Sequence, residues 1–208
     1  MKKFFLLLVS IFILSGLTAN AQHFIAKLGY NYANVSVDKN VTVADIKAGR
    51  NGWLAGIAYQ SEINNGFSLQ PELLFRNTGF KITELTDLRL GYLEVPLNVQ
   101  WGPDLLIARP YLFGGPFVGV RVRDVFRGPE NDVPADVREK IIESLRRVEW
   151  GVGVGIGVEI FKFQIAGKYN WNFGKLSTLE MSQFDKDHIA KTIAGAPRTF
   201  ELSVGLKF

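Results

Sequence analysis

The sequence of 208 residues predicts an all-β fold, an eight-stranded antiparallel transmembrane β-barrel with short periplasmic turns and long outer loops. Three observations predict it. Apolar side chains occupy every second position through eight segments, which is the period of a β-strand. Aromatic residues gather near the ends of the apolar faces, as in the girdles of membrane barrels. The opposite faces carry too many charges for a dry core, because an unpaired buried charge is costly.

Residues 1–21 are expected to precede the barrel as a secretory signal peptide. Lys2 and Lys3 are followed by an uncharged apolar run over 4–17 and then by Ala19-Asn20-Ala21. A basic start, a short apolar core and an A-x-A ending are typical of such a peptide, and the run is too short to span a bilayer as a helix. We expect cleavage near Ala21, which leaves 22–208 as the barrel domain.

The first half of the chain contains four predicted strands, over 24–32, 53–62, 67–78 and 92–101. The third of these has the clearest alternation. Its odd-numbered positions from Phe67 to Phe75 are apolar, and most even-numbered positions from Ser68 to Thr78 are polar. Each segment therefore has one face for lipid and one face for the lumen.

The second half contains the other four predicted strands, over 109–123, 150–160, 163–174 and 199–208, and the alternation is least regular in 109–123. Residues 150–160 read WGVGVGIGVEI. The spacing does not fit the G-x-G-x-x-G nucleotide motif, and the run between two glutamates is too short for a membrane helix. We expect its Val/Ile face to meet lipid. Its glycines then make room in the lumen for large residues such as Tyr92, Tyr111 or Phe117 across the barrel.

A soluble β-sandwich is the alternative architecture for alternating strands, but it would bury the charged positions of every polar face. A membrane barrel instead gathers them in its lumen, where oppositely charged side chains can pair. The predicted lumen polar network consists of Lys27, Glu72, Arg76, Glu94, Arg121, Glu149, Glu159, Lys168, Glu201 and Lys207. We expect this network to form a plug, since open aqueous pores need roughly 16–18 strands.

The connections are predicted to alternate between short and long. Short turns are expected at 64–66, 102–104 and around 161–162, and long ones over 33–51, 79–90, 124–148 and 175–197. A short amphipathic helix is predicted within 134–150 of the third long loop, the alternative being an extension of the flanking strands. Four prolines fall inside predicted strands, where bulges or strand ends must accommodate them: Pro71, Pro96, Pro110 and Pro116.

Several segments resemble the PorT-like outer-membrane β-barrel family of Bacteroidota. They are "SLQPELLFRNTGFK" (68–81), "GYLEVPLNVQW" (91–101), "RPYLFGGPFVGV" (109–120) and "ELSVGLKF" (201–208). The resemblance covers essentially all of 22–208 and is most specific in the Q-P-E-L-L and Y-L-E-V-P-L motifs. It implies an outer-membrane barrel of about eight strands. It implies no activity, although one member of the family takes part in protein secretion.

Composition excludes several classes of function. The 22 Lys and Arg residues that remain without Lys2 and Lys3 face 20 Asp and Glu residues, so the net charge of 22–208 is +2 and gives no nucleic-acid footprint. The absence of cysteine excludes disulfides and a lipid-modified amino-terminal cysteine. No cofactor and no metal are expected, since an acidic, solvated loop is the simplest interpretation of Asp185, Asp187 and His188.

The sequence therefore predicts a non-enzymatic protein of a Gram-negative outer membrane, with a structural or surface-binding role carried by its outer loops. A lipid-modifying enzyme that uses His188, with Ser177 or Ser182, is the alternative from another class, and an accessory component of a secretion system is a third. His23 is expected in a flexible periplasmic end.

The third long loop is the candidate binding segment. It combines an apolar stripe with basic residues that suit lipopolysaccharide or an envelope protein: Val137, Arg138, Lys140, Ile141, Leu145, Arg146 and Arg147. Phe208 ends the last predicted strand and is expected to be the signal for the barrel assembly machinery. The expected partners are thus outer-membrane lipid, lipopolysaccharide, that machinery and a surface or envelope protein.

Overall fold

The computed structural model describes residues 22–35, 50–81, 87–127, 147–173 and 197–208. They form eight strands: β1 (Gln22–Val35), β2 (Arg50–Asn64), β3 (Phe67–Lys81), β4 (Asp87–Trp101), β5 (Ala108–Arg127), β6 (Val148–Ile160), β7 (Phe163–Asn172) and β8 (Pro197–Lys207). The eight predicted strands are confirmed, and most extend farther at the end where the long loops were expected.

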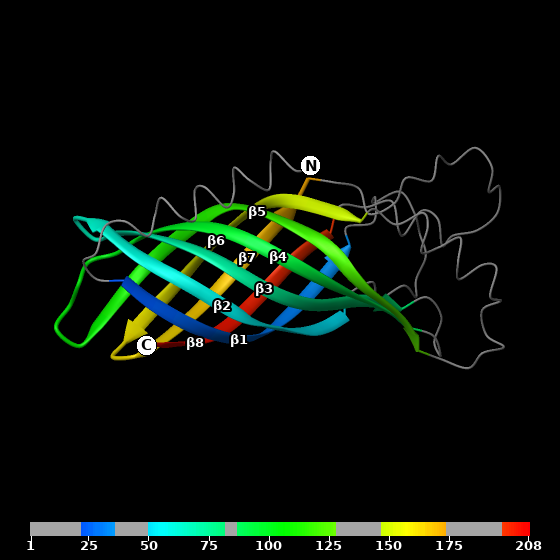
Figure 1. Ribbon diagram of the computed structural model, residues 1–208, viewed down its shortest axis with the longest axis horizontal. Coiled ribbons are helices and arrows are strands. Elements are labelled where there is room, and N and C mark those ends of the chain that lie inside the picture. Colours follow the sequence, from blue (N-terminus) through cyan, green and yellow to red (C-terminus); the bar gives the residue numbers. More distant parts are fainter. Residues whose placement is uncertain (1–21, 36–49, 82–86, 128–146, 174–196) are drawn as a thin grey trace.

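The strands close into one barrel. Each strand pairs antiparallel with the next along the chain, and β1 pairs with β8. The strands run obliquely around the barrel (Figure 1). The turns β2–β3, β4–β5 and β6–β7 lie at the same end as Gln22 and Phe208, on the left in Figure 1, and we call it the short-turn end. No helix in the described part of the chain is long and apolar enough to cross a membrane.

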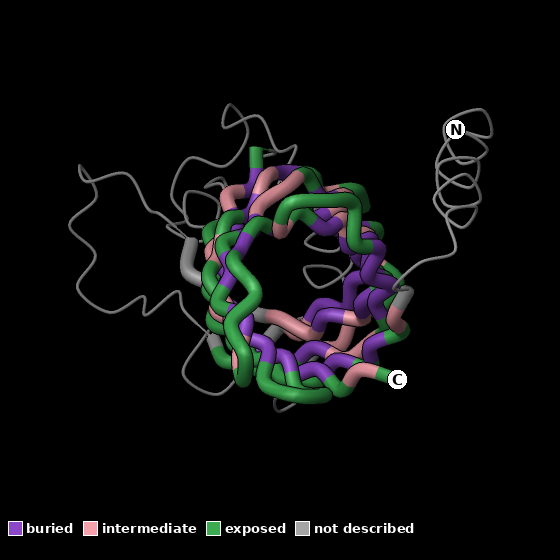
Figure 2. Tube along the Cα trace, turned by 90° about the vertical axis from the view of Figure 1, so that its left-hand side faces the viewer, coloured by how far each residue is buried: buried purple, intermediate pink, exposed green. Residues whose placement is uncertain are grey.

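Burial alternates along the strands, as the tube in Figure 2 shows. The outward positions expose large apolar side chains such as Leu28, Ile57 and Ile156, whereas the lumen positions between them are mostly buried. Aromatic pairs stand on the outward face near both ends of the strands: Phe24–Tyr59 and Phe67–Trp101 toward the short-turn end, and Trp53–Phe75, Tyr169–Trp171 and Trp150–Phe173 toward the other. An apolar band between two aromatic girdles is the surface that a bilayer requires.

A bulge in β5 explains why the alternation is irregular there. Gly91 of β4 lies opposite Arg123, and the next residue, Tyr92, lies opposite Arg121, so Val122 is the extra residue. An uninterrupted alternation over 109–123 would place Arg123 on the lumen face with Arg121, and this expectation is wrong. The extra residue turns Arg123 outward. The Cβ of Arg123 lies 3.0 Å from the position that a Cβ added to Gly91 would occupy.

The connections alternate less strictly than predicted. Asn65 and Gly66 form a tight turn with φ values of 52° and 81°, which matches the Asn-Gly hairpin signal. The prediction of a long connection over 79–90 is wrong, because β3 continues to Lys81 and β4 begins at Asp87, leaving the five residues 82–86. The β4–β5 connection on the short-turn end is longer, since 102–107 contains six residues. The extra pairs in β3 and β4 lengthen the hairpin at the expense of its loop.

The in-strand prolines are accommodated by gaps in the ladders and by a strand end, not by the β5 bulge or by the register shift of β2 between Glu62 and Asn64. The β2–β3 register passes from Ala58–Glu72 to Ser61–Leu69, and Pro71 lies in this interval. The corresponding interval of β3–β4 contains Pro96, and that of β4–β5 contains Pro116. Pro110 lies beyond the last β4–β5 pair, Trp101–Leu112. A proline has no N–H to donate, so ladder pairs are missing beside three of the four.

The glycines of β6 face the lumen and make room for aromatic rings, but the rings come from the neighbouring strand and not from across the barrel. A Cβ at Gly155 would lie 2.5 Å from Phe113 Cζ, and one at Gly151 would lie 2.9 Å from the Phe117 ring. Gly157 accommodates Tyr111 in the same way. Each ring is carried by the β5 residue directly opposite the glycine in the register. Tyr92, also predicted to fill this space, does not supply any of the atoms nearest to a Cβ added at the β6 glycines.

Two predictions fall on residues that the structure does not describe. The signal peptide over 1–21 and its cleavage site lie outside the described residues, as does most of the predicted helix within 134–150. Of that segment, Val148, Glu149 and Trp150 belong to β6.

Candidate functional site

Four glutamines and one glutamate form a closed ring of hydrogen bonds inside the barrel, near the short-turn end. Gln60 Nε2 donates to Gln100 Oε1 at 3.1 Å, and Gln100 Nε2 donates to Gln70 Oε1 at 2.7 Å. Gln164 Nε2 donates to Gln70 Oε1 at 3.0 Å and to Glu159 Oε1 at 3.2 Å. Gln60 Nε2 closes the ring by donating to Glu159 Oε1 at 2.7 Å. We call these five residues the glutamine ring.

Ion pairs tie the glutamine ring to the barrel wall. Lys27 Nζ donates to both carboxylate oxygens of Glu72 at 2.9 Å, and Gln70 Nε2 donates to the same carboxylate at 2.7 Å. Lys207 Nζ lies 2.9 Å from Glu159 Oε2. Charge-assisted hydrogen bonds of this length are the strong class, and their burial screens them from water.

Arg109 closes the short-turn end of this arrangement. Its Nη1 lies 3.4 Å from Glu159 Oε1, and its Nη2 donates to the Gly66 carbonyl at 2.9 Å and to Ser68 Oγ at 3.1 Å. Its Nε lies 3.2 Å from Asp104 Oδ1 in the β4–β5 turn. One guanidinium thus joins the β2–β3 turn, the β4–β5 turn and the glutamine ring, because its five donors point in several fixed directions.

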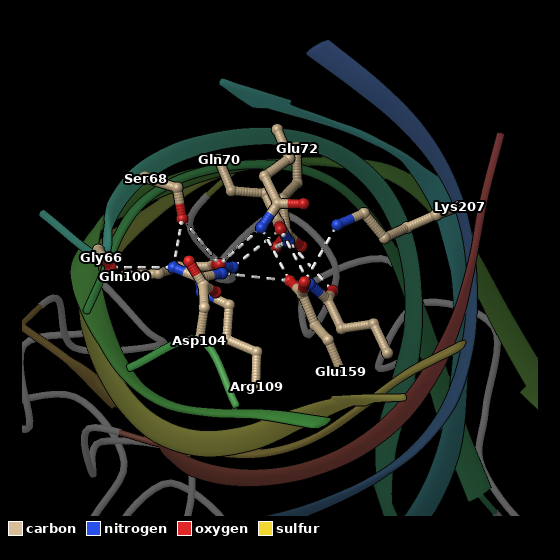
Figure 3. Close-up of polar contacts among 11 residues, drawn as sticks. Gly66, Ser68, Gln70, Glu72, Gln100, Asp104, Arg109, Glu159 and Lys207 are labelled. Carbon is tan, nitrogen blue, oxygen red and sulfur yellow. Dashed lines mark hydrogen bonds and ion pairs between the residues drawn. The ribbon is translucent and has the colours of Figure 1, made fainter. Parts of the chain in front are cut away.

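Every strand contributes to this layer, and Figure 3 shows most of its side chains across the barrel. We call the layer the plug, and its members in strand order are Lys27, Gln60, Ser68, Gln70, Glu72, Gln100, Arg109, Glu159, Gln164 and Lys207. All ten are buried or nearly so. A side-chain layer of this kind fills the narrow interior of an eight-stranded barrel.

A second buried centre lies farther from the short-turn end, around Arg76. Its Nε donates to Glu94 Oε2 at 2.8 Å and lies 3.9 Å from Glu201 Oε1, and its Nη2 pairs with Glu149. Its Cζ lies 5.3 Å from the centre of the Tyr92 ring. One arginine thus holds together three carboxylates from β4, β6 and β8. Such a cluster is stable only while its cation is present.

The two remaining cations of the predicted network border these clusters, since Lys168 lies opposite Glu201 in the β7–β8 register and Arg121 lies opposite Tyr92 in the β4–β5 register. Lys168 Nζ lies 5.6 Å from the centre of the Phe117 ring and makes no hydrogen bond to a described residue. Arg121 Nε lies 3.1 Å from Asp124 Oδ1 in the same strand. The structure therefore divides the ten predicted lumen residues into four in the plug, four around Arg76 and two, Lys168 and Arg121, that border them.

Sequence reasoning missed Arg109, Asp124 and the four glutamines of the ring. The signal was present for the glutamines, because Gln60, Gln70, Gln100 and Gln164 occupy lumen positions of the alternation. The predicted network contained charged residues only, so the uncharged amides were left out of it. Asp124 reaches the lumen side only because of the β5 bulge, which the alternation does not reveal.

The other predicted site residues are only partly described. Phe208 is exposed and its N–H donates to the Phe24 carbonyl at 2.8 Å, which joins the chain end to β1. Arg147 is exposed, and the rest of the candidate binding loop lies outside the described residues, as does His188. His23 lies within β1 opposite Gln60, so the expectation of a flexible end there is wrong. Among the described residues, no group of three or more His, Asp or Glu side chains is placed to hold a metal ion.

Comparison with known proteins assigns the family. The family described as "Outer membrane protein beta-barrel domain" matches residues 20–178. The chain belongs to this family. The protein is accordingly an outer-membrane β-barrel protein, and its location is the outer membrane. No curated protein matches it significantly.

Solved structures of outer-membrane proteins resemble this barrel at low sequence identity. Neisserial surface protein A is 16% identical, with 90% of this chain and 97% of that chain covered, and its TM-score is 0.50. The attachment invasion locus protein of Yersinia pestis is 15% identical, with 91% and 100% covered and a TM-score of 0.46. Outer membrane protein W of E. coli is 16% identical, with 92% and 100% covered and a TM-score of 0.46. The similarity to Neisserial surface protein A supports the fold and nothing beyond it.

Proposed function

We propose that this outer-membrane barrel is a closed, non-enzymatic scaffold that holds its outer loops at the cell surface for a structural or binding role. The observation that carries the proposal is the plug, to which all eight strands contribute a buried or nearly buried polar side chain. Hydrogen bonds across the lumen from every strand are expected to make the barrel rigid. Function then belongs to the connecting segments, as it commonly does on rigid scaffolds.

A finer assignment to the PorT-like group is part of the proposal. The two motifs that resemble this group most closely contain Pro71 and Pro96, and both prolines lie beside gaps in the ladders of neighbouring strands. The prolines thus have a structural role, which gives a physical reason for their presence in the two motifs. A role as an accessory component of protein secretion is the alternative function within that group.

Conductance in planar bilayers tests the closed lumen. We expect no stable current from the folded protein, because the plug crosses the lumen from β3 to β7 through Gln70 and Gln164. The double variant Gln70→Ala/Gln164→Ala should show brief openings, since it removes this link. Asn170→Ala is the matched control, because Asn170 is a buried lumen amide outside the plug. Stable porin-sized currents from the unaltered protein would contradict a closed scaffold.

Replacement of the third loop tests the binding role. A Gly-Ser linker in place of 128–146 should leave insertion and heat-shifted gel mobility intact, because the eight described strands close the barrel without this segment. Pull-down from native membranes should then lose the partners that the unaltered protein captures. The same linker in place of 174–196 is the control.

Two results would contradict the loop assignment. Retention of every partner after replacement of 128–146 would move the binding site to another loop, with 174–196 as the next candidate. A changed membrane lipid profile in a His188→Ala strain would instead support the lipid-modifying enzyme.

A further inference from the structure

The short-turn end of the barrel carries exposed apolar side chains at all four of its corners. Ile63 stands at the β2–β3 turn, Leu105, Leu106 and Ile107 form half of the β4–β5 turn, and Phe161 begins the β6–β7 turn. Phe208 stands at the fourth corner, where β8 meets β1. Leu106 is fully exposed and Phe161 is 84% exposed. Turns normally favour Gly, Asn, Asp and Ser, so large apolar residues at every corner need an explanation.

The β4–β5 turn holds its apolar residues in a fixed arrangement. Gly102 N–H donates to the Gly66 carbonyl at 3.1 Å, and Leu105 N–H donates to the Ala108 carbonyl at 3.1 Å. Asp104 is paired with Arg109 of the plug at 3.2 Å. The one charged side chain of this turn is thus paired with the plug although it is 75% exposed, and the three consecutive apolar side chains remain free to contact the surroundings.

The arrangement around the barrel identifies what covers these side chains. The four corners are evenly spaced in the closed order of eight strands, so together they surround the whole end. A single protein partner would cover one side of that end, whereas lipid surrounds all of it. The corners also continue the outward girdle, because Trp101 and Phe67 pair on the lipid-facing surface where β3 and β4 meet this end.

We propose that the short-turn end is immersed in the bilayer, with Ile63, Leu105, Leu106, Ile107, Phe161 and Phe208 in contact with the phospholipid of the leaflet at that end. The turns lie at the boundary between acyl chains and head groups, where apolar and aromatic side chains of peripheral segments insert. The barrel is therefore anchored by the tips of its turns as well as by its wall. This inference rests on the outer-membrane location and not on the proposed function.

Site-specific fluorescence tests the contact, and the chain has no cysteine that would interfere. Single variants Leu106→Cys, Phe161→Cys and Ile63→Cys are labelled with an environment-sensitive dye and inserted into phosphatidylcholine vesicles that contain brominated acyl chains. Leu28→Cys is the reference for lipid, because Leu28 is 68% exposed on the outward face. Arg147→Cys is the reference for water at the other end. Heat-shifted gel mobility verifies that each variant is folded.

We expect all three labels at the short-turn end to show blue-shifted emission and quenching by brominated lipid, close to the label at Leu28. Labels that behave like the one at Arg147 would overturn the proposal. Quenching at one corner only would also overturn it, because Ile63 and Phe161 stand at opposite corners and lipid must reach both. Protection that appears only with native membrane extract would indicate a protein partner instead.

Discussion

At the scale of single residues, the lumen glycines make the sharpest prediction. A Cβ at Gly155 would lie 2.3 Å from the Gly167 carbonyl oxygen of β7, and 2.5 and 2.6 Å from two carbons of the buried Phe113 ring. We expect Gly155→Ala to lower the free energy of unfolding by about 1–3 kcal/mol, the usual cost of overpacking a filled interior. Urea unfolding in detergent micelles, followed by tryptophan fluorescence, measures this change.

Gly167 provides the matched control for that substitution. It lies in the adjoining strand, but its Cβ direction is open, and the nearest atom, Phe200 Cζ, is 4.0 Å away. Gly167→Ala should be neutral or stabilise the fold by about 0.4–1 kcal/mol, because it reduces the freedom of the unfolded chain. Equal destabilisation by the two alanines would show that backbone freedom, and not the Phe113 ring, explains the glycine at 155.

The glycines also show how far sequence reasoning reaches at this scale. Their lumen position could be predicted from the period of two, because parity within one strand is a local property. The residue that each glycine accommodates could not be predicted. It depends on the register of β5 against β6, which places Phe113 opposite Gly155.

At the scale of elements, the end of β8 carries a prediction about assembly. Phe208 is exposed next to the lipid-facing wall, and its backbone joins the chain end to Phe24 of β1. Deletion of Phe208 should reduce the fraction of protein inserted into the outer membrane, measured by heat-shifted mobility of membrane fractions. Phe200→Ala is the control, because Phe200 is an exposed aromatic residue of the same strand away from its end. Equal losses of inserted protein in both variants would show that Phe208 acts as one lipid contact among many and not as an assembly signal.

The strands themselves were the most predictable elements. All eight appear in the sequence because a barrel wall has lipid on one face and polar groups on the other, which forces a period of two. The exceptions have local physical causes. Val122 adds one residue to β5, and so reverses the face of Arg123, without any change in composition that would reveal it. Continued pairing of β3 with β4 replaced most of a predicted loop.

At the scale of the whole molecule, the charges that are buried or ion-paired in the described lumen are balanced. The set contains six cations: Lys27, Arg76, Arg109, Arg121, Lys168 and Lys207. It also contains six carboxylates: Glu72, Glu94, Asp124, Glu149, Glu159 and Glu201. The sequence predicted that such a network exists. It could not predict which partners meet, because Arg76 and Glu149 are brought together only by closure of the barrel.

This balance predicts a large effect when one cation is removed. Arg76→Met should destabilise the barrel by about 3–5 kcal/mol, because it leaves three buried carboxylates without their shared partner. Arg123→Met is the control on the outward face and should change stability by at most about 0.5 kcal/mol. The midpoint of urea unfolding in micelles measures both. A small effect of Arg76→Met would mean that water, and not the arginine, stabilises these carboxylates.

The glutamine ring has a consequence for the response of the barrel to acid. The contacts Gln60–Gln100, Gln100–Gln70 and Gln70–Gln164 join amides, and an amide neither gains nor loses a proton across the range in which carboxylates are neutralised. Acidification therefore weakens the ion pairs around Arg76 and Lys27 but leaves a chain of neutral hydrogen bonds from β2 to β7. A bacterium that enters an acidic environment would keep this barrel shut with groups that acid does not change.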